Sequence, residues 1–161
     1  MALTQELLKK LFHYDPEVGV FIRKVSSSNA KAGSIAGCNS RGYLVISVEN
    51  KLWFAHRLAW LYMTGKMPEK VIDHINGNKK DNRFSNLRDV TNQANTQNTK
   101  KARNCNKSTM LLSATLDKRR GVYRSQIKVN GKNIYLGDFK TPELAHAAYV
   151  EAKNKYHEGA I

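Results

Sequence analysis

Cysteine is scarce in this chain. Cys38 and Cys105 are the only two cysteines among 161 residues, and they lie far apart in the sequence. A Cys-x-x-Cys pair, which forms half of many structural zinc sites, is therefore absent. We expect no structural zinc, and we expect both cysteines to be reduced thiols without a chemical role.

Long apolar runs are also missing. No segment approaches the roughly 18 apolar residues of a membrane-spanning helix. The opening segment MALTQELLKKLF has neither the apolar core nor the small-residue cleavage site of a signal peptide. The sequence therefore predicts a soluble cytoplasmic protein with no membrane partner.

Acidic residues are few. The chain has 13 Asp and Glu against 27 Lys and Arg, which gives a formal charge of +14 and a pI near 9.9. This excess is typical of proteins that bind nucleic acid, although an anionic membrane surface would attract the same charge. Residues 100–132 hold one acidic residue, Asp117, and ten basic residues: Lys100, Lys101, Arg103, Lys107, Lys118, Arg119, Arg120, Arg124, Lys128 and Lys132. The segment is either a solvated basic linker or one that follows a DNA backbone, and the neighbouring sheet pattern favours DNA.

The most informative stretch is residues 71–98. It holds an Asp-His pair at Asp73 and His74, an asparagine twelve residues after the histidine at Asn86, and another nine residues later at Asn95. An Asp-His pair alone is common, and asparagines alone usually occupy turns and helix caps. The combination at this spacing predicts a metal-dependent phosphodiesterase site.

The same stretch predicts the order strand, turn, strand, helix. A short apolar run ends at the Asp-His pair and suits a β-strand, whose alternation would send the two side chains to opposite faces. Asn76-Gly77-Asn78 is typical of a turn, residues 86–90 can return as a second strand, and Thr91 suits the N-cap of a short helix. Asparagine and threonine are weak helix formers, so we expect metal ligation or packing to hold that helix.

This arrangement resembles the HNH, or ββα-metal, nuclease family, in the variant whose third signature residue is asparagine. By that resemblance Asp73 and Asn95 hold one divalent cation, His74 is the general base, and Asn86 steadies the loop and orients the histidine. Carboxylate and amide oxygens suit Mg²⁺, with Mn²⁺ as the alternative, and a histidine can take a proton from water at neutral pH. The expected products carry 5′-phosphate and 3′-hydroxyl ends.

The first 70 residues predict small helical and hairpin elements: a helix that Thr4 can cap, a strand over residues 18–24, a hairpin of residues 43–48 and 52–55, and a helix from residue 56. Leu58, Leu61 and Tyr62 would bury one stripe of the last helix. Its opening run, His-Arg-Leu-Ala-Trp, is similar to the N-terminal part of phage HNH endonucleases.

The remaining histidines need separate weighing. His56 and Arg57 are candidates for contact with a phosphate, but a lone histidine between a strand and a helix is more often a structural hydrogen-bonder. His13, His146 and His157 have no acidic or metal-ligand partner at a telling spacing. We assign those three no chemistry.

Beyond residue 109 the pattern predicts a small sheet and a helix. Residues 123–129 alternate strictly, with Arg124, Gln126 and Lys128 on the polar face. Asn130-Gly131 is a strong hairpin signal, and residues 133–136 return with Ile134 and Leu136 inward. Residues 112–116 can supply a first strand, and Thr141-Pro142-Glu143 opens a helix with an N-cap, a proline at N1 and an early acid.

The segments GVYRSQI, NIYLGDF and TPELAHAAY look like the Apetala-type DNA-binding domain, which occurs fused to HNH nucleases. By that resemblance Arg124, Gln126 and Lys128 face DNA bases, where Arg reads guanine and Gln reads adenine. Phosphate contacts are expected from the other basic residues of this half: Arg119, Arg120, Lys100, Lys101 and Arg103. The family's usual Gly-Val pair and aromatic are missing from the first strand, and a sheet whose charged face is merely solvated is the alternative.

Together these patterns predict an α+β chain. We expect an HNH nuclease domain over residues 1–99 with its ββα-metal core at 53–99, a basic linker over 100–109, and a three-stranded antiparallel sheet with one packed helix over 110–161. The expected function is site-specific cleavage of double-stranded DNA, of the phage or homing type. A monomer would nick one strand and a homodimer could cut both. The alternatives are a non-catalytic DNA-binding regulator and a low-specificity nuclease that also attacks RNA.

Overall fold

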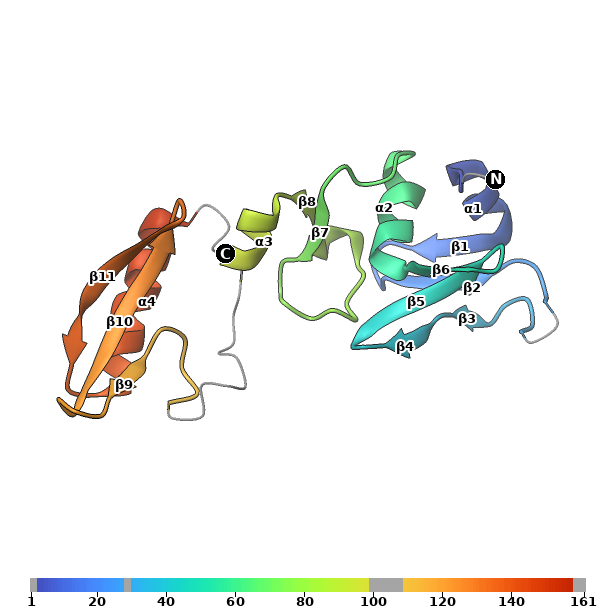
Figure 1. The fold of residues 1–161 in the computed structure, drawn as a ribbon. Coiled ribbons are helices and arrows are strands. Elements are labelled where there is room, and N and C mark those ends of the chain that lie inside the picture. The colour runs from blue at the N-terminus through green and yellow to red at the C-terminus, as the bar shows by residue number, and fades with distance from the viewer. Residues whose placement is uncertain (1–2, 28–29, 99–108, 158–161) are drawn as a thin grey trace. The chain divides into compact units, whose positions relative to one another are not determined.

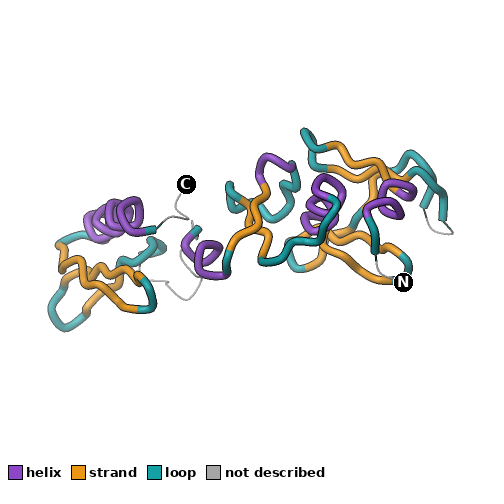
Figure 2. The backbone as a smooth tube through the Cα atoms, turned by 90° about the horizontal axis from the view of Figure 1, so that it is seen from above, coloured by secondary structure: helices purple, strands orange, loops and turns teal. Residues whose placement is uncertain are grey.

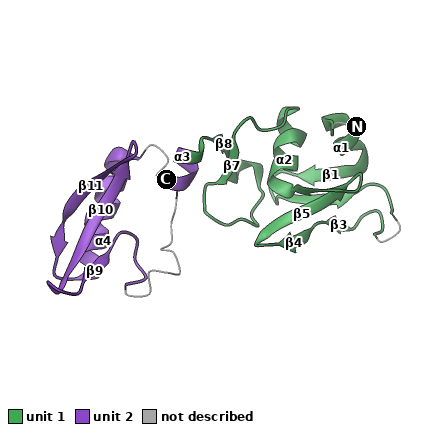
Figure 3. Ribbon diagram, viewed as in Figure 1, with its two compact units in different colours: residues 1–92 green, residues 93–161 purple. Residues whose placement is uncertain are grey.

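The computed structural model of this chain describes residues 3–27, 30–98 and 109–157. The chain forms two compact units, residues 1–92 and residues 93–161 (Figure 3), and each is described by itself. Lys100, Lys101 and Arg103 of the predicted linker lie outside the described residues. The domain limits expected from the sequence stay a prediction.

The described residues of the first unit form three small antiparallel sheets and two helices. Figure 1 shows how these elements are arranged. In chain order its elements are α1 (Gln5–Leu11), β1 (Phe12–Asp15), β2 (Val20–Arg23), β3 (Ile35–Ala36), β4 (Cys38–Ser40), β5 (Tyr43–Val48), β6 (Lys51–Phe54), α2 (Ala55–Thr64), β7 (Val71–His74), the 3₁₀ turn η1 (Phe84–Asn86) and β8 (Leu87–Val90). The sheets have the orders β1-β2-β3, β4-β5-β6 and β7-β8.

Local signals explain where the elements of this unit begin and turn. The Thr4 side chain accepts a hydrogen bond from the Leu7 amide at 3.2 Å, so the expected N-cap of α1 is confirmed. The expected hairpin of β5 and β6 turns at Glu49 and Asn50, whose φ angles are 49° and 62°. Two successive positive φ angles are those of a type I′ turn, whose twist matches that of the flanking strands.

The core of the first unit lies under α2. Leu58 and Leu61 of this helix are buried and Tyr62 packs against the same cluster, as the predicted stripe requires. Around them gather side chains from α1 and the first two sheets, among them Leu8, Phe12, Tyr14, Phe21 and Ile46. Ile72 of β7 and Leu87 of β8 belong to the same cluster, so both strands anchor the β7-β8 hairpin to the core.

The second unit is a three-stranded antiparallel sheet with one helix on it. It contains α3 (Asn92–Gln97, whose first residue falls in the first unit), β9 (Thr115–Asp117), β10 (Val122–Val129), β11 (Lys132–Phe139) and α4 (Pro142–Tyr156). The strand order is β11-β10-β9. Figure 2 shows α4 along one side of the three strands, and Ala145 and Ala152 are the buried residues of this helix. The α+β class predicted from the sequence is confirmed.

One boundary in this unit differs from the prediction. The first strand was expected over residues 112–116, but β9 covers only Thr115–Asp117. Ser113 has a φ of 56°, which breaks an extended strand, and its hydroxyl is hydrogen-bonded to the backbone of Gln126. The predicted Asn130-Gly131 turn is confirmed, with φ angles of 49° and 81°. Among the described residues, no helix is long and apolar enough to cross a membrane.

Candidate active site

The β7-β8 hairpin carries the Asp-His pair. Its register sets Asp73 opposite Arg88 and His74 opposite Leu87. Because side chains alternate along a strand, the first pair lies on one face and the second on the other, as the sequence predicted. Both Asp73 and His74 are only 5% exposed. A buried acid beside a buried base is costly unless each has a partner, so the partners define the site.

Arg88 is the partner of Asp73. Its Nε and Nη2 both donate to Oδ2 of the carboxylate, at 2.9 Å and 2.7 Å. The two side chains are 18% and 7% exposed, which places the ion pair largely out of water. Sequence reasoning missed Arg88, although its position follows once the strand register is known: it lies directly across the hairpin from Asp73.

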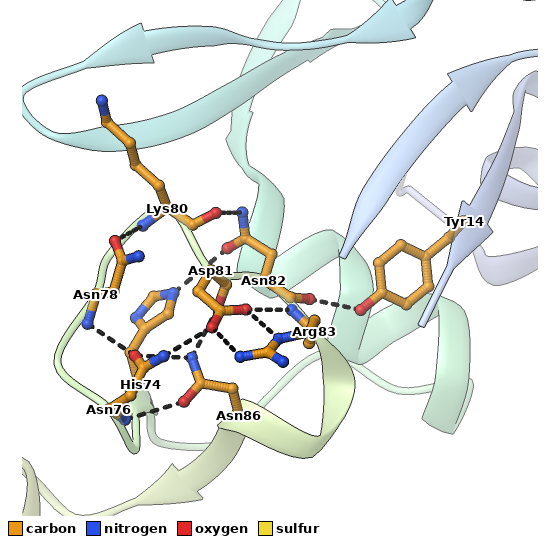
Figure 4. Close-up of polar contacts among 9 residues, drawn as sticks. All are labelled: Tyr14, His74, Asn76, Asn78, Lys80, Asp81, Asn82, Arg83 and Asn86. Carbon is orange, nitrogen blue, oxygen red and sulfur yellow. Dashed lines mark hydrogen bonds and ion pairs between the residues drawn. The ribbon is translucent and has the colours of Figure 1, made fainter. Parts of the chain in front are cut away.

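Asn82 is a partner of His74, and sequence reasoning missed it too. The Nε2 atom of His74 lies 3.3 Å from Oδ1 of Asn82, a residue that is 1% exposed (Figure 4). Burial lowers the pKa of His74, while the Asn82 hydrogen bond and the nearby Asp73 charge oppose that shift. The net direction favours a neutral imidazole at pH 7, which is the form that can accept a proton.

Asn86 ties together the loop between the two strands. Its Oδ1 accepts from the backbone amide of Asn76 at 2.9 Å, and its Nδ2 donates to Asn76 Oδ1 and to the Asp81 carbonyl at 3.1 Å and 2.8 Å. Asn86 thus makes contacts of the kind that steadying the loop requires (Figure 4), while the bond to the histidine ring described above comes from Asn82. Its part in catalysis stays a prediction.

Asp81 is a second centre of hydrogen bonds in the loop. Its carboxylate accepts from the Arg83 guanidinium and from Nδ2 of Asn76. These bonds, with Arg83 first, lower the pKa of Asp81 to about 2, so the carboxylate is ionised at any pH where the protein would be assayed. The loop therefore keeps its shape through charged contacts of its own.

His56 lies against His74 in a cluster of rings. The two imidazoles meet edge to face at 5.1 Å, Phe54 stacks on His56 at 5.3 Å, and Tyr43 lies 5.6 Å from it. His56 is 7% exposed, and its Nδ1 has no hydrogen-bond partner among the described residues. Burial, then the nearby His74 and Arg57, lower its pKa to about 4. His56 is therefore neutral at pH 7 and packs among these rings, and Arg57 is partly exposed on α2. The phosphate contact expected of His56 and Arg57 stays a prediction.

Asn95 lies in α3, within the second compact unit, and is partly buried there. Its expected partnership with Asp73 stays a prediction. Among residues 3–27, 30–98 and 109–157, no three His, Cys, Asp or Glu side chains gather as a metal cage. One buried carboxylate and one amide carbonyl are nevertheless hard oxygen donors, and they fit a Mg²⁺ ion that keeps most of its waters.

The outer face of the second unit presents the basic and polar residues expected there. Arg124, Gln126 and Lys128 are exposed on β10, while Ser125 and Ile127 between them are buried. Asp138 of β11 pairs with both Arg120 and Arg124, and the Arg124 guanidinium lies 5.8 Å from the centre of the Tyr135 ring. Arg124 is thus exposed but oriented by these contacts. Arg119 is exposed as well.

Two histidines without predicted chemistry hold α4 to the rest of the second unit: His146 on α4 contacts the segment before β9, and His157, the residue after α4, contacts β10. A ring nitrogen of His146 lies 2.9 Å from the Leu112 carbonyl, and one of His157 lies 3.0 Å from the Lys128 carbonyl. Both contacts are of hydrogen-bond length to backbone oxygens. They give these residues a structural part in the second unit.

The comparisons with known proteins bear on the central segment. The family model described as HNH endonuclease matches residues 54–97, from the last residue of β6 through α2 and the hairpin into α3. No curated protein and no solved structure matches the chain. The matched segment contains Asp73, His74, Asn86 and Asn95 in the order and spacing described above. Residues 54–97 are therefore similar to the HNH endonuclease family.

Proposed function

We propose that this chain is a DNA endonuclease that hydrolyses phosphodiester bonds, with Asp73 and Asn95 as ligands of one divalent cation and His74 as general base. The observation that carries the proposal is the β7-β8 hairpin, which holds a buried imidazole next to a buried carboxylate inside the HNH segment. The imidazole of His74 has Asn82 as a partner, and the carboxylate of Asp73 has Arg88.

The reaction follows from what His74 can do. Its imidazole accepts a proton from a water molecule as the water oxygen forms a bond to the phosphorus. The bond between phosphorus and the 3′ oxygen breaks, and that oxygen leaves as a 3′-hydroxyl once it is protonated by solvent. The products are a 5′-phosphate and a 3′-hydroxyl end, and one site cuts one strand.

The cation would supply charge stabilisation on the phosphate and on the leaving oxygen when it is bound. Asp73 contributes a negative oxygen and Asn95 a neutral one, so the protein ligands leave most of the charge of Mg²⁺ or Mn²⁺ for the substrate. Arg88 holds the Asp73 carboxylate in one orientation across the hairpin. Two N–H groups of one guanidinium on the same carboxylate oxygen restrict the direction of that carboxylate.

The second unit would determine where the enzyme cuts. We propose that its β-sheet is an Apetala-type reader that lies in a DNA groove, with Arg124, Gln126 and Lys128 toward base edges. The alternation of exposed polar and buried residues on β10 supports this role. Arg119 and Arg120 would contact phosphates, as would Lys100, Lys101 and Arg103 of the basic segment.

The test is conversion of supercoiled DNA, carrying a pool of random inserts, by wild type and His74→Ala in Mg²⁺ and in chelator. We expect wild type to produce open circles or linear DNA only with metal, and the variant to lose that activity by about 10²-fold or more. His13→Ala is the matched control, because His13 is an exposed histidine on β1.

The products separate the alternatives. Open circles indicate a nicking monomer, and direct linear product indicates paired active sites. Conversion of every insert at one rate, or attack on RNA as well, would favour the low-specificity nuclease. Binding of DNA without any conversion would contradict the proposal and favour the DNA-binding regulator.

A further inference from the structure

We propose that Asn82 is a positioning residue for His74: its side-chain oxygen holds the proton of the imidazole on Nε2 and so leaves Nδ1 as the nitrogen that accepts a proton from water. The inference rests on the proposed function, because it concerns the base of that reaction. It is carried by a chain of contacts that runs from β1 through the loop to the histidine (Figure 4).

The direction of the Asn82 amide is set by its other contact. Nδ2 of Asn82 lies 3.2 Å from the backbone carbonyl of Lys80, and only the NH₂ end of an amide can donate to a carbonyl. The oxygen end therefore faces His74, 3.3 Å from Nε2. An amide oxygen can only accept, so Nε2 must carry the hydrogen and the lone pair of the neutral ring lies on Nδ1.

Asn82 is itself fixed from the far side. Its backbone carbonyl accepts a hydrogen bond of 2.6 Å from the hydroxyl of Tyr14, a β1 residue that is 1% exposed and 68 residues away in sequence. Gly19, in the turn between β1 and β2, lies very close to the same peptide. A side-chain Cβ at this position would lie only 2.6 Å from the Asn82 carbonyl carbon. The Phe84 amide also donates to the Pro16 carbonyl at 3.1 Å. The loop is thus docked on the first sheet at several points.

The alternative tautomer is disfavoured by this geometry. With the hydrogen on Nδ1, the Nε2 lone pair would face the Asn82 oxygen, and two acceptors would be buried against each other without a proton between them. Leaving a buried polar atom without its partner is unfavourable, and this holds one tautomer in large excess. The geometry therefore prepares the base before substrate arrives.

The test compares Asn82→Ala with Asn78→Ala, which removes an asparagine of the same loop whose side-chain oxygen accepts from the Lys80 amide. On a cleaved duplex, we expect Asn82→Ala to lower kcat by about 10- to 100-fold, the usual effect of removing a partner that orients a histidine. KM should stay within about twofold, since phosphate binding is untouched. Asn78→Ala should change kcat by less than about threefold.

A spectroscopic readout separates positioning from general damage. In metal-free protein labelled with ¹⁵N-histidine, at a pH where the ring is neutral, the His74 nitrogens should report a single tautomer with hydrogen on Nε2. Asn82→Ala should give a mixture of tautomers, and Asn82→Asp, which keeps an acceptor oxygen, should restore the single tautomer and part of kcat. Tyr14→Phe removes only the hydroxyl that binds the Asn82 carbonyl. Its kcat and its share of the Nε2-protonated tautomer should lie between those of wild type and Asn82→Ala.

Unchanged kcat in folded Asn82→Ala, or the same single tautomer with and without the Asn82 oxygen, would overturn the inference. If wild type cleaves no DNA, the proposed function fails and this role falls with it. The tautomer measurement does not depend on activity. It therefore still shows whether Asn82 sets the tautomer of His74, separately from whether the protein cleaves DNA.

Discussion

His56 and His74 are neighbours that share one environment. Their rings meet at 5.1 Å, both are nearly buried, and burial is the largest cause of the lowered pKa of each. A protonated His56 would face both the His74 ring and the Arg57 charge, which further lower its pKa. A neutral His56 therefore keeps a positive charge away from His74.

The pKa of His56 makes stability depend on pH. It falls from 6.5 in the unfolded chain to about 4 in the folded protein, so the unfolded chain binds this proton more tightly. The free energy of unfolding should therefore decrease as pH falls from about 6.5 toward 4, by up to about 1.4 kcal/mol per pH unit from this group, and be unaffected by it at higher pH.

Urea unfolding at about pH 7 and about pH 5 checks this for wild type and His56→Gln. The variant lacks the titrating ring and should lose less stability on acidification, although His74, whose pKa is lowered too, keeps part of the effect. Equal losses in the two proteins would show that His56 does not titrate as described.

At the level of elements, the β7-β8 hairpin depends on a pair of opposite charges. Arg88→Met should lower the free energy of unfolding by about 3 kcal/mol, because it leaves the Asp73 carboxylate buried without its guanidinium. The double variant Asp73→Asn with Arg88→Met should lose clearly less than the sum of the two single variants. Denaturant unfolding of the four proteins measures the coupling, and simple additivity would contradict a cooperative pair.

The hairpin also shows what could be read from the sequence and what could not. Turn residues and alternation were enough to place β7, β8 and β10, because those signals are local. For the return strand they were not enough: it was expected over residues 133–136 with Ile134 inward, but β11 covers Lys132–Phe139 and Ile134 is 38% exposed. Asn82 was not found, since nothing in its neighbourhood separates it from Asn76 or Asn78. Its contact with His74 depends on how the loop is docked, and one docking contact comes from Tyr14, 68 positions away. The first strand of the second unit was misplaced because an apolar run gives no sign of the positive φ at Ser113.

The exposed face of β10 leads to a prediction about sequence choice. Arg124 is oriented by Asp138 and the Tyr135 ring, which suits a side chain that reads a base, while Arg119 lies in the turn before the strand. Arg124→Ala should cost on the order of 1–3 kcal/mol on a selected target and relax sequence choice. Arg119→Ala should weaken all sequences alike. Competition between target and random duplexes measures both, and equal effects of Arg124→Ala on the two DNAs would exclude base reading.

At the scale of the whole molecule, positive charge is present in both compact units. Residues 1–92 contain 14 basic and 8 acidic residues, and residues 93–161 contain 13 and 5. The HNH segment spans the limit between the units, since it ends at residue 97. Both units therefore carry the excess of positive charge that phosphate binding requires.

This distribution predicts a steep effect of salt on DNA binding. Each phosphate that the protein neutralises releases condensed counterions, so the logarithm of affinity should fall linearly with the logarithm of salt concentration, with a slope of about −0.9 per phosphate contacted.

Arg119→Ala, which removes an expected phosphate contact, should make the slope shallower by about 1. Lys155→Ala removes the same charge from α4, the helix on the other side of the sheet, and should leave the slope unchanged. Fluorescence anisotropy on one labelled duplex over a range of KCl concentrations gives all three slopes. A flat dependence in wild type would exclude phosphate binding as the role of the charge, and equal changes in the two variants would show that net charge matters and the contact of Arg119 does not.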